Sequence, residues 1–170
     1  MDKQAFRKMV RRVKPDTASS FLIIQKLLQN AKFRSAATVL MYYSLPDEPF
    51  THDIINSLEG KTVLLPRVVD AENMEIRQYT GSSDMQLGAF GILEPTGPVV
   101  SDYAAIDVAV VPGIAFDRQC HRMGRGRGYY DRFLAPVPSI HKIGICFPER
   151  LFDAIPFCPH DVVMDEVVTL

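Results

Sequence analysis

The sequence lacks several features that would place it in a class at once. It contains no apolar run long enough to span a bilayer, and its start, Met-Asp-Lys-Gln, continues with charged residues rather than the apolar core of a signal peptide. It also lacks an excess of charge, because 19 basic and 20 acidic residues leave a net charge of −1. This balance excludes a global field that would attract nucleic acid or membrane. We therefore expect a cytoplasmic protein in which any anion site is local.

Cysteine is scarce as well. Cys120, Cys146 and Cys158 are widely spaced, form no CxxC pair and have no histidine at zinc-finger distance. They are expected to be reduced thiols, as is usual in the cytosol. No internal repeat or low-complexity tract is present, and 170 residues suit one hydrophobic core. We expect a single domain over residues 1–170.

One dense segment stands out against these absences. Glycines and arginines alternate in the order Gly124, Arg125, Gly126, Arg127, Gly128, directly after an apolar run and a polar loop. Because glycine has no Cβ, the backbone N–H groups of such a turn can approach an anion closely. Guanidinium groups suit phosphate oxygens, and a helix beginning near Gly128 would direct its positive end to the same place. The segment predicts a phosphate-binding turn.

A carboxylate follows this turn. Asp131 lies three residues beyond Gly128, where it would repel a phosphate unless a cation lay between them. Mg²⁺ is the usual cation, held by one or two carboxylates together with phosphate oxygens. The dinucleotide fingerprint would need Gly at position 129, which is Tyr, and the Walker A spacing is absent. The segment predicts a nucleotide–Mg²⁺ site of a different kind.

Two motifs together carry a family resemblance. Phe116-Asp117 and residues 122–132, Arg-Met-Gly-Arg-Gly-Arg-Gly-Tyr-Tyr-Asp-Arg, resemble the signature of the 5-formyltetrahydrofolate cyclo-ligase family. That family usually has Gly at position 120 and Leu at 123, where this chain has Cys120 and Met123. The resemblance implies conversion of 5-formyltetrahydrofolate to 5,10-methenyltetrahydrofolate, through a phosphorylated formyl intermediate, with release of ADP and phosphate. It implies ATP, Mg²⁺ and a small-molecule folate. With the balanced charge, we expect no nucleic acid and no membrane partner, and we expect a monomer.

The same resemblance assigns roles to individual residues. The implied ATP contacts are Lys3, Gln4, Ala5, Phe6, Arg7, Arg122, Met123, Gly124, Arg125, Gly126, Arg127, Gly128, Tyr129 and Tyr130. The implied folate contacts are Tyr43, Glu48, Arg125, Gly126, Arg127, Gly128 and Tyr129. Arg125, Arg127 and Tyr130 are the predicted catalytic residues, and Asp131 and Asp165 the predicted metal ligands. From spacing alone, Lys3 and Arg7 would be a solvated basic face, Glu48 a charge at a helix start and Asp165 a solvated strand end.

The order of the elements predicts an α/β fold, a single-domain, doubly wound, mostly parallel sheet with helices on both faces. Strands are expected at residues 36–43, 62–66, 106–111, 140–146 and 161–168, with an edge strand at 75–79. Helices are expected after Asp2, at 51–58 and at 150–155, and along a core stripe of Phe21, Ile24, Leu27 and Leu28. Residues 80–100, rich in Gly, Ser and Pro, are expected to form a surface loop.

Two rival functions stay open from the sequence. An RNA-binding module could use the Arg-Gly segment beside two tyrosines, although such segments usually repeat within basic, disordered chains. A sugar-phosphate isomerase or acyl-transferring enzyme could share the fold, because fold does not determine function. A strict requirement for ATP would exclude the second, and RNA retention on a filter would reveal the first.

Overall fold

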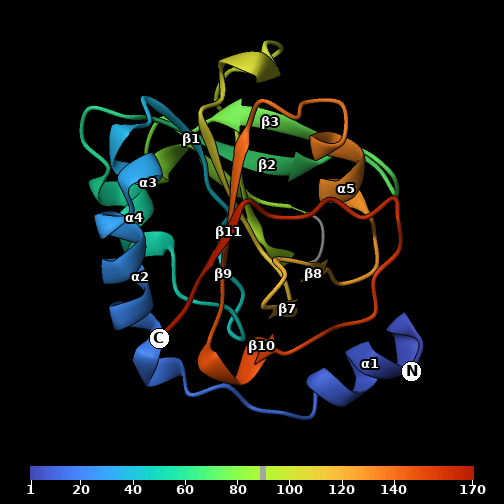
Figure 1. The fold of residues 1–170 in the computed structure, drawn as a ribbon. Helices are drawn as coiled ribbons and strands as arrows, with labels where there is room; N and C mark the ends of the chain where they lie inside the picture. Colours follow the sequence, from blue (N-terminus) through green and yellow to red (C-terminus); the bar gives the residue numbers. More distant parts are fainter. Residues whose placement is uncertain (89–90) are drawn as a thin grey trace.

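A six-stranded sheet forms the centre of the molecule in the computed structural model, which describes residues 1–88 and 91–170 (Figure 1). Its strands lie in the order β11 (Glu166–Val168), β9 (His141–Ile145), β6 (Val108–Val111), β1 (Thr38–Leu40), β2 (Thr62–Val68) and β3 (Met74–Gln78). The first five are parallel to one another, and β3 pairs antiparallel with β2 at the edge. The mostly parallel sheet and the edge strand are confirmed.

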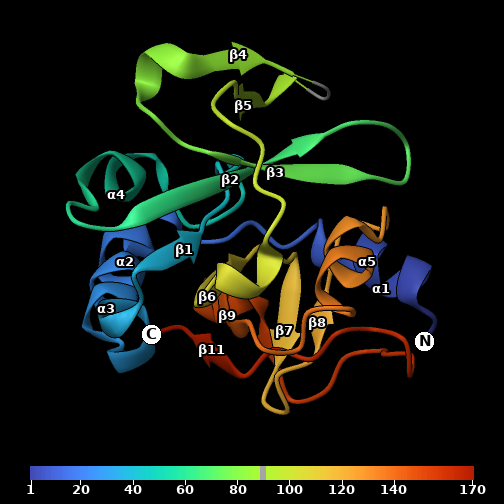
Figure 2. The ribbon, with the colours of Figure 1, turned by 90° about the horizontal axis from the view of Figure 1, so that it is seen from above.

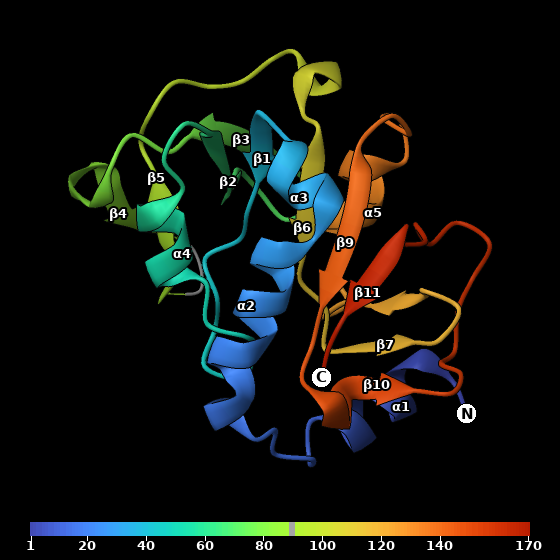
Figure 3. The same ribbon diagram turned by 60° about the vertical axis from the view of Figure 1, so that its left-hand side comes forward.

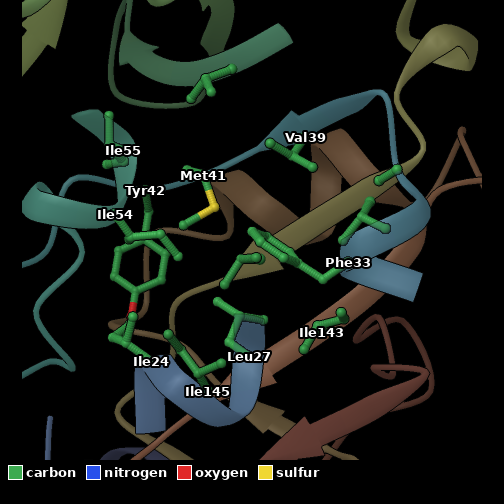
Figure 4. Packing of buried hydrophobic residues seen from close by; sticks show 14 of the residues in the cluster. Ile24, Leu27, Phe33, Val39, Met41, Tyr42, Ile54, Ile55, Ile143 and Ile145 are labelled. Atoms are coloured by element: carbon green, nitrogen blue, oxygen red, sulfur yellow. The ribbon is translucent and has the colours of Figure 1, made fainter. Parts of the chain in front are cut away.

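Helices cover both faces of this sheet, as expected (Figure 2). On one face lie α2 (Ser20–Gln29), α3 (Ala31–Ser35) and α4 (His52–Ser57), and on the other lies α5 (Tyr129–Leu134). Side chains alternate along a strand, so Val108 and Val110 of β6 join the core under α2 and α3, while Val111 joins the core under α5. Figure 4 shows the first of these cores, in which Leu27 packs among strand residues. A strand buried on both faces explains the continuous apolar run in the sequence.

A smaller sheet lies on the α5 side and receives the N-terminal helix (Figure 3). It contains β10 (Leu151–Phe152), β7 (Ala115–Asp117) and β8 (Arg122–Met123) in that order. Helix α1 (Lys3–Val10) begins at Asp2, whose carboxylate accepts a hydrogen bond from the Ala5 N–H at 2.7 Å. Phe6 of α1 packs edge-on against Phe152, with ring centroids 5.2 Å apart. The helix is thereby attached to the same unit as the glycine turn.

Three local predictions are wrong. Phe21 is 68% exposed, whereas Ile23 is fully buried, because the buried face of α2 runs through Ile23, Ile24 and Leu27. Residues 150–155 form no α-helix, since a short 3-10 helix ends at Arg150 and Leu151 pairs with Phe116 as a strand. Residues 80–100 contain a two-stranded hairpin, β4 (Met85–Leu87) and β5 (Leu93–Pro95), rather than a plain loop. Positions 89–90 of that segment lie outside the described residues.

Cys120 has a positive φ of 66°, a left-handed conformation that favours glycine. The glycine that the resemblance leads us to expect at this position would adopt this conformation without steric cost. Among the described residues, no helix is long and apolar enough to cross a membrane.

Asp117 is a buried hydrogen-bonding centre between β7 and the segments around it. Its Oδ1 accepts from the N–H groups of Gln119 at 3.0 Å and His121 at 2.9 Å. Its Oδ2 accepts from the Ile155 N–H at 3.1 Å and lies 2.9 Å from Nδ1 of His121. One side chain therefore stabilises the hairpin that leads into the glycine turn.

We expect Asp117→Ala to lower the free energy of unfolding by about 3 kcal/mol, because it removes the acceptor of the buried Ile155 N–H and of the part-buried N–H groups of Gln119 and His121. Urea denaturation of both proteins measures the difference. Asp153→Ala is the matched control, since that side chain is 94% exposed and forms one surface ion pair. Equal stability of the two variants would contradict the role given to Asp117.

Candidate functional site

A cavity of about 960 Å³ opens at the carboxyl ends of β1, β2 and β6, the edge at which open α/β sheets bind ligands. Its walls come from α1, the loop after β1, the β2–β3 and β4–β5 hairpins, and the glycine turn. The residues that line it are Lys3, Arg7, Arg11, Tyr42, Tyr43, Leu45, Glu48, Pro66, Val68, Met74, Ile92, Leu93, Glu94, Pro112, Gly113, residues 122–132, Ala135, Cys158, His160 and Asp161. Segments from both ends of the chain thus meet in one cavity.

The glycine turn forms one wall and has the backbone geometry that its composition predicts. Gly126 and Gly128 have φ values of 106° and 72°, which side chains with a Cβ rarely adopt. Arg7 of α1 reaches the turn and donates from Nε to the Gly124 carbonyl at 2.9 Å. Helix α5 begins directly after Gly128 and is only six residues long. The turn's own backbone and arginines are therefore the main candidates for binding an anion.

The predicted segments contribute unequally to the cavity. All of the glycine-turn residues predicted to bind ligands line it, as do Tyr43 and Glu48. From the N-terminal segment, Lys3 and Arg7 line it, but Gln4, Ala5 and Phe6 do not. Phe6 is only 6% exposed and packs in the core beneath α1. The spacing of Lys3 and Arg7 thus places one face of the helix on the cavity.

Glu48 is buried in the cavity wall and paired with Arg125. Its Oε1 accepts from Nη2 of Arg125 at 3.0 Å, and its Oε2 accepts from the Leu45 N–H at 2.8 Å. Burial raises the pKa of Glu48 above its ordinary value, while the Leu45 N–H and Arg125 act in the opposite direction. Arg125 also contacts Asp47. A buried carboxylate and the glycine turn are therefore within hydrogen-bonding distance of each other.

The two tyrosines that follow the turn have different surroundings. Tyr129 is half-buried at the rim, and its hydroxyl donates to the Asp70 carbonyl at 2.8 Å. Tyr130 packs against the core, and the guanidinium of Arg122 lies 5.7 Å from its ring centre. Burial raises the pKa of the Tyr130 hydroxyl well above its ordinary value. Tyr130 is therefore a neutral group of the cavity wall at physiological pH.

Asp131 lines the cavity together with an acid that the sequence did not single out, Asp161. Oδ1 of Asp131 accepts from Nη2 of Arg122 at 3.0 Å and from the Val162 N–H at 3.2 Å, which brings Asp161 into the same region. Asp161 contacts Nζ of Lys3 and accepts from the Cys158 N–H at 2.7 Å. Burial raises the pKa of Asp161, but these hydrogen bonds outweigh it and hold the pKa below its ordinary value.

Asp165, the second predicted metal ligand, is not brought to Asp131. It directly precedes β11 and therefore lies at the amino ends of the parallel strands, whereas the cavity lies at their carboxyl ends. Its Oδ2 accepts from the backbone N–H of Lys142 at 2.7 Å and lies 2.9 Å from Nζ of the same residue. It lines a separate, smaller pocket beside His141. The structure therefore brings Asp161, and not Asp165, into the cavity that contains Asp131.

No pattern in the sequence distinguishes Asp161, because residues 161–168 predict a single strand. The strand contains only residues Glu166–Val168, and Asp161 lies in the irregular segment before it. Two carboxylates suit Mg²⁺, which is commonly held by one or two carboxylates plus phosphate oxygens. Within residues 1–88 and 91–170, no three acidic, histidine or cysteine side chains gather so as to hold a metal by themselves. The site fits a metal that arrives with a phosphate ligand.

Comparisons with known proteins agree with one another. The model of the 5-formyltetrahydrofolate cyclo-ligase family matches residues 3–170. A probable 5-formyltetrahydrofolate cyclo-ligase of Schizosaccharomyces pombe is 28% identical over 171 residues, which cover 89% of this chain and 84% of the relative. The 5-formyltetrahydrofolate cyclo-ligase of Mycolicibacterium smegmatis is 33% identical over 144 residues, covering 79% and 74% of the two chains. The 5,10-methenyltetrahydrofolate synthetase of Aquifex aeolicus superimposes with a TM-score of 0.87 at 29% identity, covering 99% of this chain and 90% of that one.

Proposed function

Because the chain belongs to the 5-formyltetrahydrofolate cyclo-ligase family, we propose that it converts 5-formyltetrahydrofolate and ATP into 5,10-methenyltetrahydrofolate, ADP and phosphate. The observation that carries this proposal is Arg125, a residue of the glycine turn that donates to the buried carboxylate of Glu48 at 3.0 Å. A phosphate on the turn and a folate at Glu48 would then lie beside each other. Adjacent binding of the two substrates is what transfer of a phosphoryl group between them requires.

The chemistry of the proposed reaction defines what the protein must supply. The formyl oxygen attacks the γ-phosphorus of ATP, and the bond to ADP breaks, which converts a poor leaving group into a phosphate ester. N10 of the folate then attacks the formyl carbon, the carbon–oxygen bond breaks with departure of phosphate, and the N10 proton is lost. Phosphoryl transfer depends mainly on positioning and on neutralising charge. The side chains needed are therefore cations at the phosphates and donors or acceptors that orient the pterin.

The cavity offers cations from two directions. Arg125 and Arg127 come from the glycine turn, and Lys3 and Arg7 come from α1, which contacts that turn through Arg7. We assign the α1 pair to the nucleotide phosphates and the turn arginines to the transferred group. Mg²⁺ held by Asp131 and Asp161 would neutralise phosphate charge when it is bound. Arg122 is the positioning residue for Asp131, to which it donates at 3.0 Å.

The folate is assigned to the side of the cavity that contains Glu48 and Tyr43. A carboxylate suits the pterin because its amino group and ring N–H offer two donors side by side. The ring of Tyr43 is stacked on that of His52, with centroids 3.6 Å apart and planes 16° apart, so it is a rigid wall. Apolar side chains of the β2–β3 hairpin, Val68 and Met74 among them, face the same cavity and suit the ring system.

We expect the absorbance of the methenyl product to grow only when purified protein, 5-formyltetrahydrofolate, ATP and Mg²⁺ are all present. Omission of each component in turn is the control. Product formation without ATP would contradict the ligase and favour an isomerase-type or acyl-transferring activity. No product from folded protein, together with retention of RNA on a filter, would favour the RNA-binding module.

A cytoplasmic location and a monomeric state stay predictions. Light scattering on a sizing column measures the oligomeric state.

A further inference from the structure

Two side chains of α5 bind the main chain of the turn between β2 and β3, about sixty residues away. Tyr129 donates from its hydroxyl to the Asp70 carbonyl at 2.8 Å, and Arg132 donates from Nε to the Glu72 carbonyl at 2.7 Å. Figures 1 and 2 both show this turn beside α5. The β2–β3 hairpin and the glycine turn form different walls of the cavity. The two hydrogen bonds therefore join those walls at the rim.

The β2–β3 turn is itself a well-ordered anchor. The carboxylate of Asp70 accepts from the N–H of Glu72 at 2.8 Å and from the N–H of Asn73 at 2.9 Å. It also accepts from the side-chain amide of Asn73 at 3.0 Å. These hydrogen bonds lower the pKa of the exposed Asp70, and the one from the Asn73 side chain has the largest effect. The carbonyls of Asp70 and Glu72 are thus held in fixed positions by the turn.

Arg132 makes a second contact that bears directly on the glycine turn. Its Nη2 donates to the Arg127 carbonyl at 2.8 Å, and its guanidinium lies 5.5 Å from the ring centre of Tyr129. A Cβ at Gly128 would lie only 2.6 Å from Nη1 of Arg132, so the guanidinium packs against the glycine backbone itself. Gly128 also has a φ of 72°, so another residue here would be strained in its backbone and would displace the guanidinium of Arg132.

The planar peptide bond turns this contact into control of a ligand-binding group. The Arg127 carbonyl and the Gly128 N–H belong to one peptide unit and point in opposite directions. A donor that holds the carbonyl on one side fixes the direction of the N–H on the other. N–H groups of such a turn are the ones expected to bind phosphate. Arg132 therefore bears on phosphate binding through the Gly128 peptide.

We infer that Arg132 is a positioning residue for the nucleotide phosphates, which it serves by joining the Arg127–Gly128 peptide to the β2–β3 turn. The inference rests on the proposed function, because it assumes that the glycine turn binds ATP. Its effect is on the affinity for nucleotide rather than on the chemistry, since Arg132 binds two main-chain carbonyls that belong to the walls of the site. A residue that only stabilised the fold would leave the KM for ATP unchanged.

Arg132→Met tests this inference, because it keeps an apolar stem and removes every donor. We expect the KM for ATP to rise by about tenfold, the loss typical of hydrogen bonds from a charged donor, with a smaller change in kcat. Arg132→Lys keeps the charge and one donor and should recover part of the affinity. Arg118→Met is the matched control, since the Arg118 side chain is 69% exposed and donates from Nε to Asp153 at 3.0 Å on the surface.

Binding of a non-hydrolysable ATP analogue, measured by calorimetry, gives a readout that does not depend on turnover. If the wild-type protein neither binds the analogue nor forms product, the proposed function fails. If the wild type does both while Arg132→Met binds the analogue as tightly as the wild type, the inference about Arg132 is overturned. The inference would also be overturned if Arg132→Met lost activity only in proportion to a lower melting temperature, because the loss would then reflect unfolding rather than weaker binding of nucleotide. Should Arg132→Met not fold, the same measurements on Arg132→Lys decide, since a single donor still predicts weaker analogue binding.

Discussion

Replacing Asp131 with asparagine is expected to lower kcat/KM by at least about a hundredfold, the loss typical of removing one charged group from a phosphoryl-transfer site. The substitution keeps an oxygen that can accept from Arg122 and from the Val162 N–H, so the fold should persist. It removes the negative charge that a magnesium ion needs. We therefore expect the Mg²⁺ concentration at half-maximal activity to rise in the variant, in addition to the loss of rate.

Two further variants compare Asp161, which lines the cavity, with Asp165, which the family resemblance indicated as a metal ligand. Asp161→Asn should reduce activity and Mg²⁺ affinity as Asp131→Asn does, because Asp161 lines the same cavity. The activity of Asp165→Asn should stay within about twofold of that of the wild type. Its partner is Lys142, at the amino ends of the strands, whereas the cavity lies at their carboxyl ends. Mg²⁺ titrations of the three variants and the wild type form one experiment. A large loss in Asp165→Asn, with Asp161→Asn unaffected, would reverse the assignment.

Replacing Arg125 with glutamine is the second substitution for which a large loss is expected. We predict a fall in kcat/KM of about 10² to 10³, because one change removes a cation from the phosphates and the partner of a buried carboxylate. Arg125 donates to Glu48 from Nη2 at 3.0 Å and from Nε at 3.3 Å. Arg125→Lys keeps the charge but not the planar fork, so it should recover only part of the activity.

The pH dependence of Arg125→Gln provides a signature of the pair. Burial raises the pKa of Glu48, and Arg125 lowers it, so loss of Arg125 should raise this pKa further. Glu48 would then become protonated at a higher pH than in the wild type, and the carboxylate that we assign to the pterin would be lost there as pH falls. We expect the KM for the folate to increase at a higher pH in the variant. Identical pH profiles of KM for the two proteins would contradict this coupling.

Much of the fold could be predicted because it depends on patterns between neighbouring residues. The apolar run that contains Val108–Val111 indicated a strand buried on both faces, and Asp2 indicated the start of a helix. The wrong predictions fall where partners are distant in sequence. Leu151 and Phe152 form a strand because β7, thirty-five positions earlier, offers a free edge. Phe21 is exposed because α2 packs on the sheet through the face that contains Ile23 and Leu27.

The sequence by itself determined the glycine turn, the acid that follows it and the family, because the chemistry of this site is concentrated in eleven consecutive residues, 122–132. Only the tertiary structure decided which groups complete the site. Lys3 and Asp161 are 158 positions apart and meet in the cavity, as Glu48 and Arg125 do over 77 positions. The periodicity of a chain reports which face of an element is buried, but not which distant element lies opposite. For that reason the family resemblance indicated Asp165 as the second metal ligand, whereas the position of Asp161 in the cavity is visible only in the fold.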